Sequence, residues 1–536
     1  MNDRRDEFDA VVVGAGFAGL YMLHRLRGLG LSVRVYETGA GVGGTWYWNR
    51  YPGARCDVES MQYSYQFSDE LAQEWRWSER YSAQPEILRY AEHVAERFDL
   101  KRDIQFNTRV ASAHFDEASS EWRIRTEAGN VVHARHVVMA TGCLSAVNLP
   151  DIPGRDSFSG ATYHTARWPH EGVDFTGLRV GVIGTGSSAV QSIPQIARQA
   201  EKLFVFQRTP TYSIPAHNKP LDPEEEQRIK ADYRGYRARV AQTPFNVDGA
   251  YSEESALSVS EEERQRVYEG KWAIGGLAYM GAFRDLVLDP KANGTAQDFV
   301  REKIRGIVKD PAVAEALSPE FFLGCKRLCI DTGYYETFNR PNVRLVDLRR
   351  TPLDRIVPEG LRTSERLYDL DALVFATGFD AMTGALSRID IRGRAGKTLK
   401  EAWAGGPKTY LGISTVGFPN LFMICPGPGS PSVLSNMLPS IEQHVNFIAD
   451  CIGYMGERQL ATIEPCEDAQ DAWVAHVNEV AEPTLFPKTN SWYVGANIPG
   501  KTRVFMPYIG GYPVYVEKCK DVAAKGYDGF ALSPRG

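Results

Sequence analysis

The sequence lacks the marks of several large protein classes. Its 536 residues contain eight cysteines and no Cys-x-x-Cys pair, so neither a zinc site nor a disulfide framework is expected. No run approaches the roughly 18 apolar residues of a membrane helix, and the opening MNDRRDEF does not resemble a secretory signal. The formal net charge of −6 indicates no basic face for nucleic acid. We therefore expect a cytoplasmic, reduced protein with no metal, no nucleic-acid partner and no membrane association.

A first nucleotide-binding pattern lies near the N-terminus. The apolar run 9–13 leads into Gly14-Ala15-Gly16-Phe17-Ala18-Gly19, and leucines then follow at helical spacing. Such glycines let a strand turn tightly and let backbone N–H groups approach a pyrophosphate at the helix N-terminus. A second strand, 32–36, ends in Glu37, where a carboxylate can accept hydrogen bonds from a ribose diol. Together with the later Gly43-Gly44 doublet, the arrangement resembles the FAD site of flavoproteins that have two dinucleotide-binding domains.

The pattern returns in the second quarter of the chain. The strand 179–183 leads into Gly184-Thr185-Gly186-Ser187-Ser188-Ala189 and a helix, and the next strand is 203–206. Gln207 stands where the acid of the first pattern stands, and Arg208 follows it. A carboxylate would repel a 2′-phosphate, whereas a guanidinium can bind it, so the pattern predicts NADPH rather than NADH. The alternative reading of Arg208 is a solvated cation at a strand end.

Two further strands end in Ala-Thr-Gly, at 140–142 and 376–378, where flavoproteins of this class cross between their two domains. The chain is also too long for one core. We predict an α/β fold of two Rossmann-like dinucleotide-binding domains with an inserted helical region. The FAD-binding domain would comprise 1–145 and 381–536, the NADPH-binding domain 146–214 and 321–380, and the helical insertion 215–320. Pro223, at an expected first helical turn, supports the insertion.

Two long strings narrow the choice of reaction. A disulfide reductase would need a cysteine pair close behind the first pattern, and Cys56 stands there alone. Residues 158–169, FSGATYHTARWP, match the FxGxxxHxxxWP motif of type I Baeyer–Villiger monooxygenases. Residues 43–57, GGTWYWNRYPGARCD, fit the other long motif of that family, and GPGSPSVLSNM at 427–437 is also shared. The chain therefore resembles this family over essentially its whole length, most closely phenylacetone and steroid monooxygenases.

The resemblance implies an enzyme that uses FAD, NADPH and dioxygen to convert ketones to esters or lactones through a C4a-peroxyflavin. Such chemistry requires an anionic peroxide, stabilisation of the charge on the adduct, and exclusion of water. Two alternatives stay open: an N- or S-oxygenating flavin monooxygenase, and a non-catalytic NADPH-binding redox sensor or scaffold. A monomer or weak homodimer is expected.

The resemblance also assigns the residues that act. Arg327 of the Lys326-Arg327 pair would sit over the flavin and hold the nicotinamide, Asp57 would orient it, and Lys326 would join Arg208 at the 2′-phosphate. From the residues alone, a Lys-Arg pair is more typical of surface charge. His164 is either a structural histidine or, with Trp168, a residue that couples domain movement to cofactor state. Trp492 is either a mobile-loop residue that closes over NADP⁺ or a core aromatic.

Three sets complete the expected site. The FAD-binding set is Gly14, Gly16, Phe17, Ala18, Gly19, Glu37, Gly44, Thr45, Trp46, Asp57, Tyr63 and Met437. The NADP-binding set is Gly184, Thr185, Gly186, Ser187, Ser188, Gln191, Arg208, Thr209, Lys326, Arg327, Ala376, Thr377, Gly378 and Trp492. The substrate-pocket set is Val58, Cys143, Leu144, Ser432, Val433, Leu434 and Met437.

Two local features accompany these sets. Ser440-Ile441-Glu442-Gln443 predicts a capping box that starts a helix through Met455, with its N-terminus aimed at the flavin pyrimidine ring. Cys143 stands where the phenylacetone enzyme has glutamine, so substrate preference is not expected to transfer from that enzyme.

Overall fold

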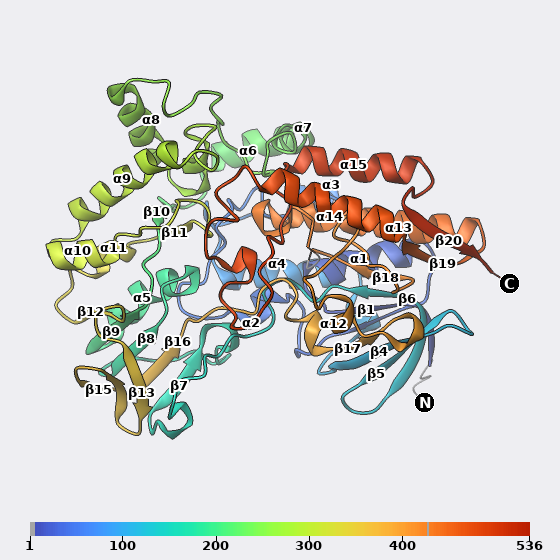
Figure 1. The fold of residues 1–536 in the computed structure, drawn as a ribbon, viewed down its shortest axis with the longest axis horizontal. Helices are drawn as coiled ribbons and strands as arrows, with labels where there is room; N and C mark the ends of the chain where they lie inside the picture. The colour runs from blue at the N-terminus through green and yellow to red at the C-terminus, as the bar shows by residue number, and fades with distance from the viewer. Residues whose placement is uncertain (1–5, 426–427, 536) are drawn as a thin grey trace.

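The computed structural model describes residues 6–425 and 428–535, so Gly427 of the GPGSPSVLSNM string lies outside the described residues. Two largely parallel sheets organise the chain (Figure 1). The first sheet has the order β17-β4-β5-β6-β1-β2-β3, and β18 also pairs with β6. Its strands are β1 (Glu7–Val13), β2 (Val33–Tyr36), β3 (Ile104–Gln105), β4 (Val110–Asp116), β5 (Glu121–Thr126), β6 (Val131–Met139), β17 (Asp390–Arg392) and β18 (Leu421–Met423).

The second sheet is fully parallel, with the order β12-β9-β8-β16-β7. Its strands are β7 (Ala161–His164), β8 (Arg179–Ile183), β9 (Lys202–Gln207), β12 (Val343–Asp347) and β16 (Ala372–Phe375). In each sheet a glycine-rich turn leads from a buried strand into a helix, α1 (Phe17–Gly28) after β1 and α5 (Ser187–Gln199) after β8. The predicted α/β fold with two Rossmann-like units is therefore confirmed.

The first glycine of each turn needs its missing side chain. Gly14 has φ +108°, and a Cβ there would lie 2.5 Å from the carbonyl oxygen of Ala140. Gly184 has φ +118°, and a Cβ there would lie 2.4 Å from the carbonyl oxygen of Ala376. Only glycine tolerates both the backbone angle and the contact. Each Ala-Thr-Gly string thus packs against the start of one nucleotide-binding turn.

The two connections between the sheets run side by side. Val147 pairs with Phe379 in an antiparallel bridge, Asn148 N–H donates to the Gly378 carbonyl at 3.0 Å, and Asp380 N–H donates to the Ala146 carbonyl at 2.8 Å. The strands of the first sheet lie within 7–139 and 390–423, and those of the second within 161–207 and 343–375. The chain therefore leaves the first sheet and returns to it at one place, while the exact domain boundaries stay a prediction.

Helices occupy the segment between β10 (Ser213–Pro215) and β11 (Cys329–Asp331), at the upper left and top centre of Figure 1. They are α6 (Pro223–Ala231), α7 (Tyr233–Val240), α8 (Glu261–Ile274), α9 (Pro290–Ile307) and α10 (Pro311–Leu317). As predicted, Pro223 opens a helix, and the Asp222 carboxylate accepts a hydrogen bond from Glu224 N–H as its N-cap. Aromatic rings of α8 and α9, such as Tyr268 and Phe299, belong to the same apolar cluster as the core of the second sheet.

The helix predicted to begin at Ser440 starts earlier. It is α13 (Met437–Glu457), and Asn436 is its N-cap, accepting a hydrogen bond from Leu438 N–H at 3.4 Å. Ser440 lies in the first turn, where its hydroxyl donates to the Asn436 carbonyl at 3.0 Å. The predicted capping box is therefore wrong: asparagine caps as well as serine does, and Pro439 in the first turn sacrifices no intrahelical hydrogen bond.

The remaining elements surround the two sheets. The helices are α2 (Thr45–Trp48), α3 (Asp69–Glu74), α4 (Gln84–Arg97), α11 (Tyr334–Thr337), α12 (Leu399–Ala402), α14 (Glu467–Ala481) and α15 (Tyr512–Ala524). The strands are β10 (Ser213–Pro215), β11 (Cys329–Asp331), β13 (Leu353–Val357), β14 (Gly360–Thr363), β15 (Leu367–Asp369), β19 (Leu460–Pro465) and β20 (Phe530–Pro534). Among the described residues, no helix combines the length and apolar character needed to cross a bilayer.

Candidate active site

The turn after β1 forms a cradle with features that fit a dinucleotide. A Cβ on Gly44 would lie 2.8 Å from the Cα of Gly16, so the two backbones meet closely. The Glu37 carboxylate accepts hydrogen bonds at 2.7 Å from Ala15 N–H and from Gly39 N–H, and burial raises its pKa despite these bonds. The Thr141 hydroxyl is buried with no partner among the described residues, as expected where a polar ligand binds. The predicted FAD residues around β1 and β2 therefore lie together.

Three aromatic residues from the same predicted set also meet. Trp46 on α2 donates its indole N–H to the Tyr63 hydroxyl at 3.1 Å, and the Tyr63 ring lies edge-on to Phe17 at 6.0 Å between centroids. Thr45 opens α2 directly after Gly44. Met437, the first residue of α13, packs against both the cluster that contains these rings and the apolar cluster described below.

Two cations without a carboxylate partner among the described residues lie near one another, Arg208 directly after β9 and Lys326 three residues before β11. Arg208 is exposed, and Lys326 lies with its Nζ 4.3 Å from the centre of the Phe321 ring. Burial and the nearby Arg208 charge lower the pKa of Lys326, so the two cations repel one another. Neither Arg208 nor Lys326 forms an ion pair with any residue in the described ranges, 6–425 and 428–535. An anion such as a 2′-phosphate fits between such groups.

Side chains in the turn after β8 form hydrogen bonds with other parts of the chain. The Thr185 hydroxyl donates to the Thr209 carbonyl at 2.5 Å, and the Ser187 hydroxyl lies 3.3 Å from the Cys329 sulfur. Gln207, at the position of the missing acid, is buried and donates its amide to the Ala316 carbonyl at 2.7 Å. That side chain is therefore engaged at the end of α10.

Arg327 and Asp57 meet although they are 270 residues apart in the sequence. The guanidinium Nε and Nη2 each donate to one Asp57 carboxylate oxygen at 2.7 Å, and Nη1 donates to the Val433 carbonyl at 2.8 Å. The two side chains are 23 % and 25 % exposed. Burial disfavours the charge, but the Asp57 carboxylate outweighs it and raises the pKa of Arg327 above its ordinary value. The site thus holds a permanent cation in a fixed orientation.

A third contact to this guanidinium comes from Tyr493, which the sequence interpretation did not single out. Its buried hydroxyl lies near the Arg327 guanidinium, and burial raises its pKa to about 12. Tyr493 follows Trp492 in a short 3₁₀ turn, and the two rings lie 4.3 Å apart. The only sequence signal was its position beside Trp492.

An apolar cluster adjoins the ion pair and collects most of the predicted pocket residues. Its members from the predicted sets are Cys143, Leu144, Val433, Leu434, Met437 and Trp492, and it also contains Phe486, Tyr493 and Phe505. Val58 packs in a different cluster, with the core of the first sheet. Ser432 is fully buried and donates its hydroxyl to the Cys425 carbonyl at 2.7 Å, so this hydroxyl is engaged within the protein. Burial raises the pKa of the Cys143 thiol to about 12, which keeps it neutral.

His164 lies at the paired connections between the sheets. Its Nδ1 accepts a hydrogen bond from Ala166 N–H at 3.0 Å, which leaves Nε2 as the donor toward the Thr377 hydroxyl at 3.2 Å and the Asn148 carbonyl at 3.3 Å. Burial lowers its pKa to about 4, so the ring is neutral at pH 7. Trp168 is buried in the core of the second sheet against Tyr163, with 5.5 Å between ring centroids.

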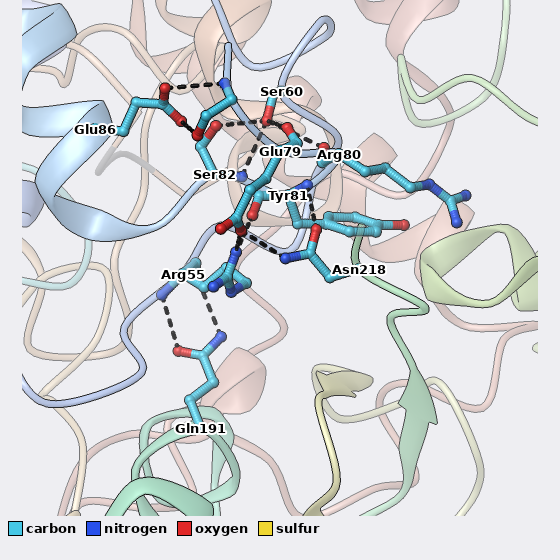
Figure 2. A network of polar contacts seen from close by, with 10 residues as sticks. Arg55, Ser60, Glu79, Arg80, Tyr81, Ser82, Glu86, Gln191 and Asn218 are labelled. Carbon is cyan, nitrogen blue, oxygen red and sulfur yellow. Dashed lines mark hydrogen bonds and ion pairs between the residues drawn. The ribbon is translucent and has the colours of Figure 1, made fainter. Parts of the chain in front are cut away.

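Gln191, which was predicted to bind NADP, hydrogen-bonds with another part of the chain. Its side-chain amide, on α5, reaches the backbone of Arg55 rather than the nucleotide-binding turn (Figure 2). Arg55 stands two residues before Asp57 in the GGTWYWNRYPGARCD string.

Comparisons with known proteins agree with this geometry. Residues 11–271 match the family model described as pyridine nucleotide-disulphide oxidoreductase. A Baeyer–Villiger monooxygenase of Pseudooceanicola batsensis is 45% identical, over 97% of this chain and 95% of its own. The chain belongs to the Baeyer–Villiger monooxygenase family. Its predicted family membership is thereby confirmed.

Two further members place the chain within this family. A solved structure of oxidized steroid monooxygenase bound to NADP superposes with a TM-score of 0.95 at 55% identity and covers 99% of this chain and 100% of that one. A phenazine N-monooxygenase of Lysobacter antibioticus is 44% identical over 99% of this chain and 98% of its own. The relatives of this chain are thus named for two different reactions, Baeyer–Villiger oxygenation and N-oxygenation.

Proposed function

We propose that this chain is a Baeyer–Villiger monooxygenase that uses FAD, NADPH and dioxygen to convert a ketone into an ester or lactone. The reaction balances as ketone, O₂, NADPH and a proton giving ester, water and NADP⁺. The observation that carries the proposal is the Arg327–Asp57 pair, a permanent cation held beside a mostly apolar cluster.

Each cofactor has a set of residues that fits it. The turn at Gly14 and Gly16, with Glu37 and the unpartnered Thr141 hydroxyl, would hold FAD. The start of α5 would take the NADPH pyrophosphate, with Arg208 and Lys326 on its 2′-phosphate. The second pattern carries no acid in the place of Glu37, which supports NADPH over NADH.

Reduced FAD supplies the activated oxygen when it is bound. Arg327 has five N–H donors, and three of them are engaged by Asp57 and Val433. A remaining N–H would donate to the ketone oxygen as that oxygen gains negative charge. Asp57 acts on the guanidinium alone, since both of its oxygens accept from Arg327. The pair therefore stabilises developing charge without needing to exchange a proton.

The apolar cluster would exclude water from the reacting atoms. Phe486, Phe505 and Met506 are buried in it beside Val433. A neutral Cys143 thiol adds no charge to this wall. The pocket therefore favours a carbonyl compound with an apolar body, because a charged substrate would be desolvated without a partner.

The test is product analysis on two variants. Arg327→Ala should still permit reduction of the flavin by NADPH but should abolish ester formation, and the consumed oxygen should appear as hydrogen peroxide. Arg327→Lys keeps the charge but loses the two-pronged contact, and it should retain only a small part of the ester yield. Wild-type protein given ¹⁸O₂ and ketones should place one ¹⁸O atom in the ester. Full ester yield from Arg327→Ala would remove the catalytic assignment.

A second candidate function is N-oxygenation, favoured by the 44% identity to a phenazine N-monooxygenase. A ring nitrogen attacks the oxygen atom that is transferred, whereas a ketone is attacked by it. The cation at Arg327 favours the anionic attack and hence the ketone reaction. Competition between a phenazine and a ketone in one reaction, with both products quantified, decides between the two functions.

We also propose the finer organisation of the molecule. The FAD-binding domain would comprise 1–145 and 381–536, and the NADPH-binding domain 146–214 and 321–380, with 215–320 as the helical insertion. A monomer or weak homodimer located in the cytoplasm is the proposed state. Sedimentation at micromolar and submicromolar concentrations tests the assembly.

A further inference from the structure

The segment that carries Asp57 is held on both of its edges. On one edge it pairs with 82–84: Cys56 N–H donates to the Ser82 carbonyl at 3.2 Å, and Gln84 N–H donates to the Ala54 carbonyl at 2.9 Å. On the other edge the side-chain amide of Gln191 forms two hydrogen bonds with the Arg55 backbone, as a neighbouring strand would. Gln191 Nε2 donates to the Arg55 carbonyl at 3.0 Å, and its Oε1 accepts from Arg55 N–H at 3.3 Å (Figure 2).

The contact between α5 and this segment is close. A Cβ on Gly53, whose φ is +85°, would lie 2.3 Å from the backbone oxygen of Gln191. Tyr51 is buried and donates its hydroxyl to Gln191 Oε1 at 2.8 Å, and Ser188 lies near the same hydroxyl. Ser188 lies in the first turn of α5, where the nucleotide pyrophosphate is expected. The nucleotide-binding turn and the Asp57 segment are therefore joined by side chains on one helix.

The Arg55 side chain anchors the same segment from the opposite direction. Its Nη1 donates to the Glu79 carboxylate and to the Tyr81 carbonyl (Figure 2). Asn218 donates to that carboxylate at 2.6 Å and accepts from Tyr81 N–H at 2.9 Å. Because these contacts fix Arg55 on one side, a shift of α5 acts on the segment through Gln191 on the other.

We propose that Gln191 is a positioning residue that couples occupancy of the NADP site on α5 to the placement of Asp57, and through Asp57 to the orientation of Arg327. The inference rests on the proposed function, since it concerns the same ion pair. It also gives Gln191 a role different from direct binding of NADP. A displaced Asp57 would leave Arg327 misaligned, so oxygen would be lost as hydrogen peroxide instead of entering the ester.

The experiment compares FAD-loaded wild-type protein with Gln191→Ala, Gln191→Glu and a matched control, Gln195→Ala. Gln195 lies one turn further along α5, and within the described part of the chain its side chain forms a single hydrogen bond, accepted from Arg198 at 3.0 Å. Hydrogen exchange of the peptide spanning 51–57 is measured with and without NADP⁺, together with the NADP⁺ dissociation constant and the ratio of ester to peroxide. Melting temperature and flavin content show that each variant is folded.

In wild-type protein and Gln195→Ala, NADP⁺ should slow exchange in 51–57 about tenfold, because a bound nucleotide would hold α5 and thereby stabilise the segment against local opening. In Gln191→Ala that slowing should vanish while the NADP⁺ dissociation constant stays within about threefold, since no NADP⁺ contact is lost. Gln191→Glu keeps the acceptor for Tyr51 and Arg55 N–H but loses the donor to the Arg55 carbonyl. The slowing of exchange by NADP⁺ in this variant should therefore lie between that of wild-type protein and that of Gln191→Ala.

Two results would overturn the inference: preserved slowing in Gln191→Ala, or equal loss of slowing in Gln195→Ala. Preserved slowing in Gln191→Ala together with a large rise in its NADP⁺ dissociation constant would make Gln191 an NADP ligand. The exchange and binding measurements need no ketone. Absence of ester from wild-type protein would therefore refute the proposed function without deciding the coupling.

Discussion

Asp57→Asn isolates what the carboxylate does for Arg327. In the native protein each carboxylate oxygen accepts one guanidinium N–H at 2.7 Å. Asparagine has nearly the same shape, but it offers one oxygen and turns an NH₂ group toward the second N–H. At one position the asparagine NH₂ would therefore face a guanidinium N–H, so that two donors meet and no hydrogen bond forms. At the other position the acceptor would be a neutral amide oxygen instead of a charged carboxylate oxygen.

The size of the effect follows from these contacts. A hydrogen bond to a charged group contributes about 1.5–3 kcal/mol, so the loss of one bond and the weakening of the other would amount to roughly 3–4 kcal/mol in a dry site. The two side chains are 23 % and 25 % exposed, and solvent screening lowers the figure to about 2–3 kcal/mol. At 1.36 kcal/mol per factor of ten, ester formation should slow by about 30- to 150-fold.

The assay separates the two halves of the reaction. Anaerobic rapid mixing with NADPH measures flavin reduction, which should change by no more than a few-fold because Asp57 does not approach the 2′-phosphate cations. Aerobic turnover measures ester and hydrogen peroxide, and the ester fraction should fall. Asp371→Asn is the matched control, since Asp371 also forms a two-pronged pair, with Arg179 at 2.8 and 3.0 Å, but in the second sheet's domain. Ester formation by Asp57→Asn within twofold of wild type would refute the reasoning.

Two further predictions concern the cofactor and pH. Arg208→Ala should raise the NADPH KM by roughly one to two orders of magnitude, as loss of a charged hydrogen bond implies, with NADH turnover unchanged; a wild-type enzyme that used NADH equally well would contradict this. His136, His164 and His444 each have a pKa lowered by burial from 6.5 to about 4, so each contributes stability above pH 6.5 that is lost as pH falls toward 4. Glu442 acts in the opposite direction, because burial raises its pKa to about 7. At ~1.4 kcal/mol per pKa unit, the free energy of unfolding should fall by several kcal/mol as the pH falls from 6.5 to 4. Urea unfolding at each pH measures this loss.

The local patterns predicted the fold well because each reflects a steric need. Gly14 and Gly184 occupy backbone angles and contacts that only glycine tolerates, so their positions marked both nucleotide-binding turns. The N-cap of α13 was predicted four residues late, since two good capping residues, Asn436 and Ser440, stand close together and the sequence does not rank them. Spacing along the chain cannot choose between equivalent local solutions.

The site residues divide in the same way. Residues adjacent to a motif, such as Glu37 and Trp46, lie where the pattern places them. Tyr493 and the actual contacts of Gln191 were not predictable, because they depend on how segments far apart in sequence approach one another. The family resemblance marked the Lys326-Arg327 pair, which composition alone would have assigned to the surface.

The contacts of Arg327 bring together three segments that are far apart in the sequence. Arg327 precedes β11 on the side of the helical insertion, whereas Asp57 follows the first nucleotide-binding turn, 270 residues earlier. Val433, 106 residues later, supplies the third direction of the same guanidinium. Arg327 is thus correctly oriented only when the segments that carry Asp57 and Val433 are both in place. Under the proposed coupling through Gln191, the orientation of this cation would also depend on occupancy of the NADP site, which would coordinate flavin reduction with oxygen transfer.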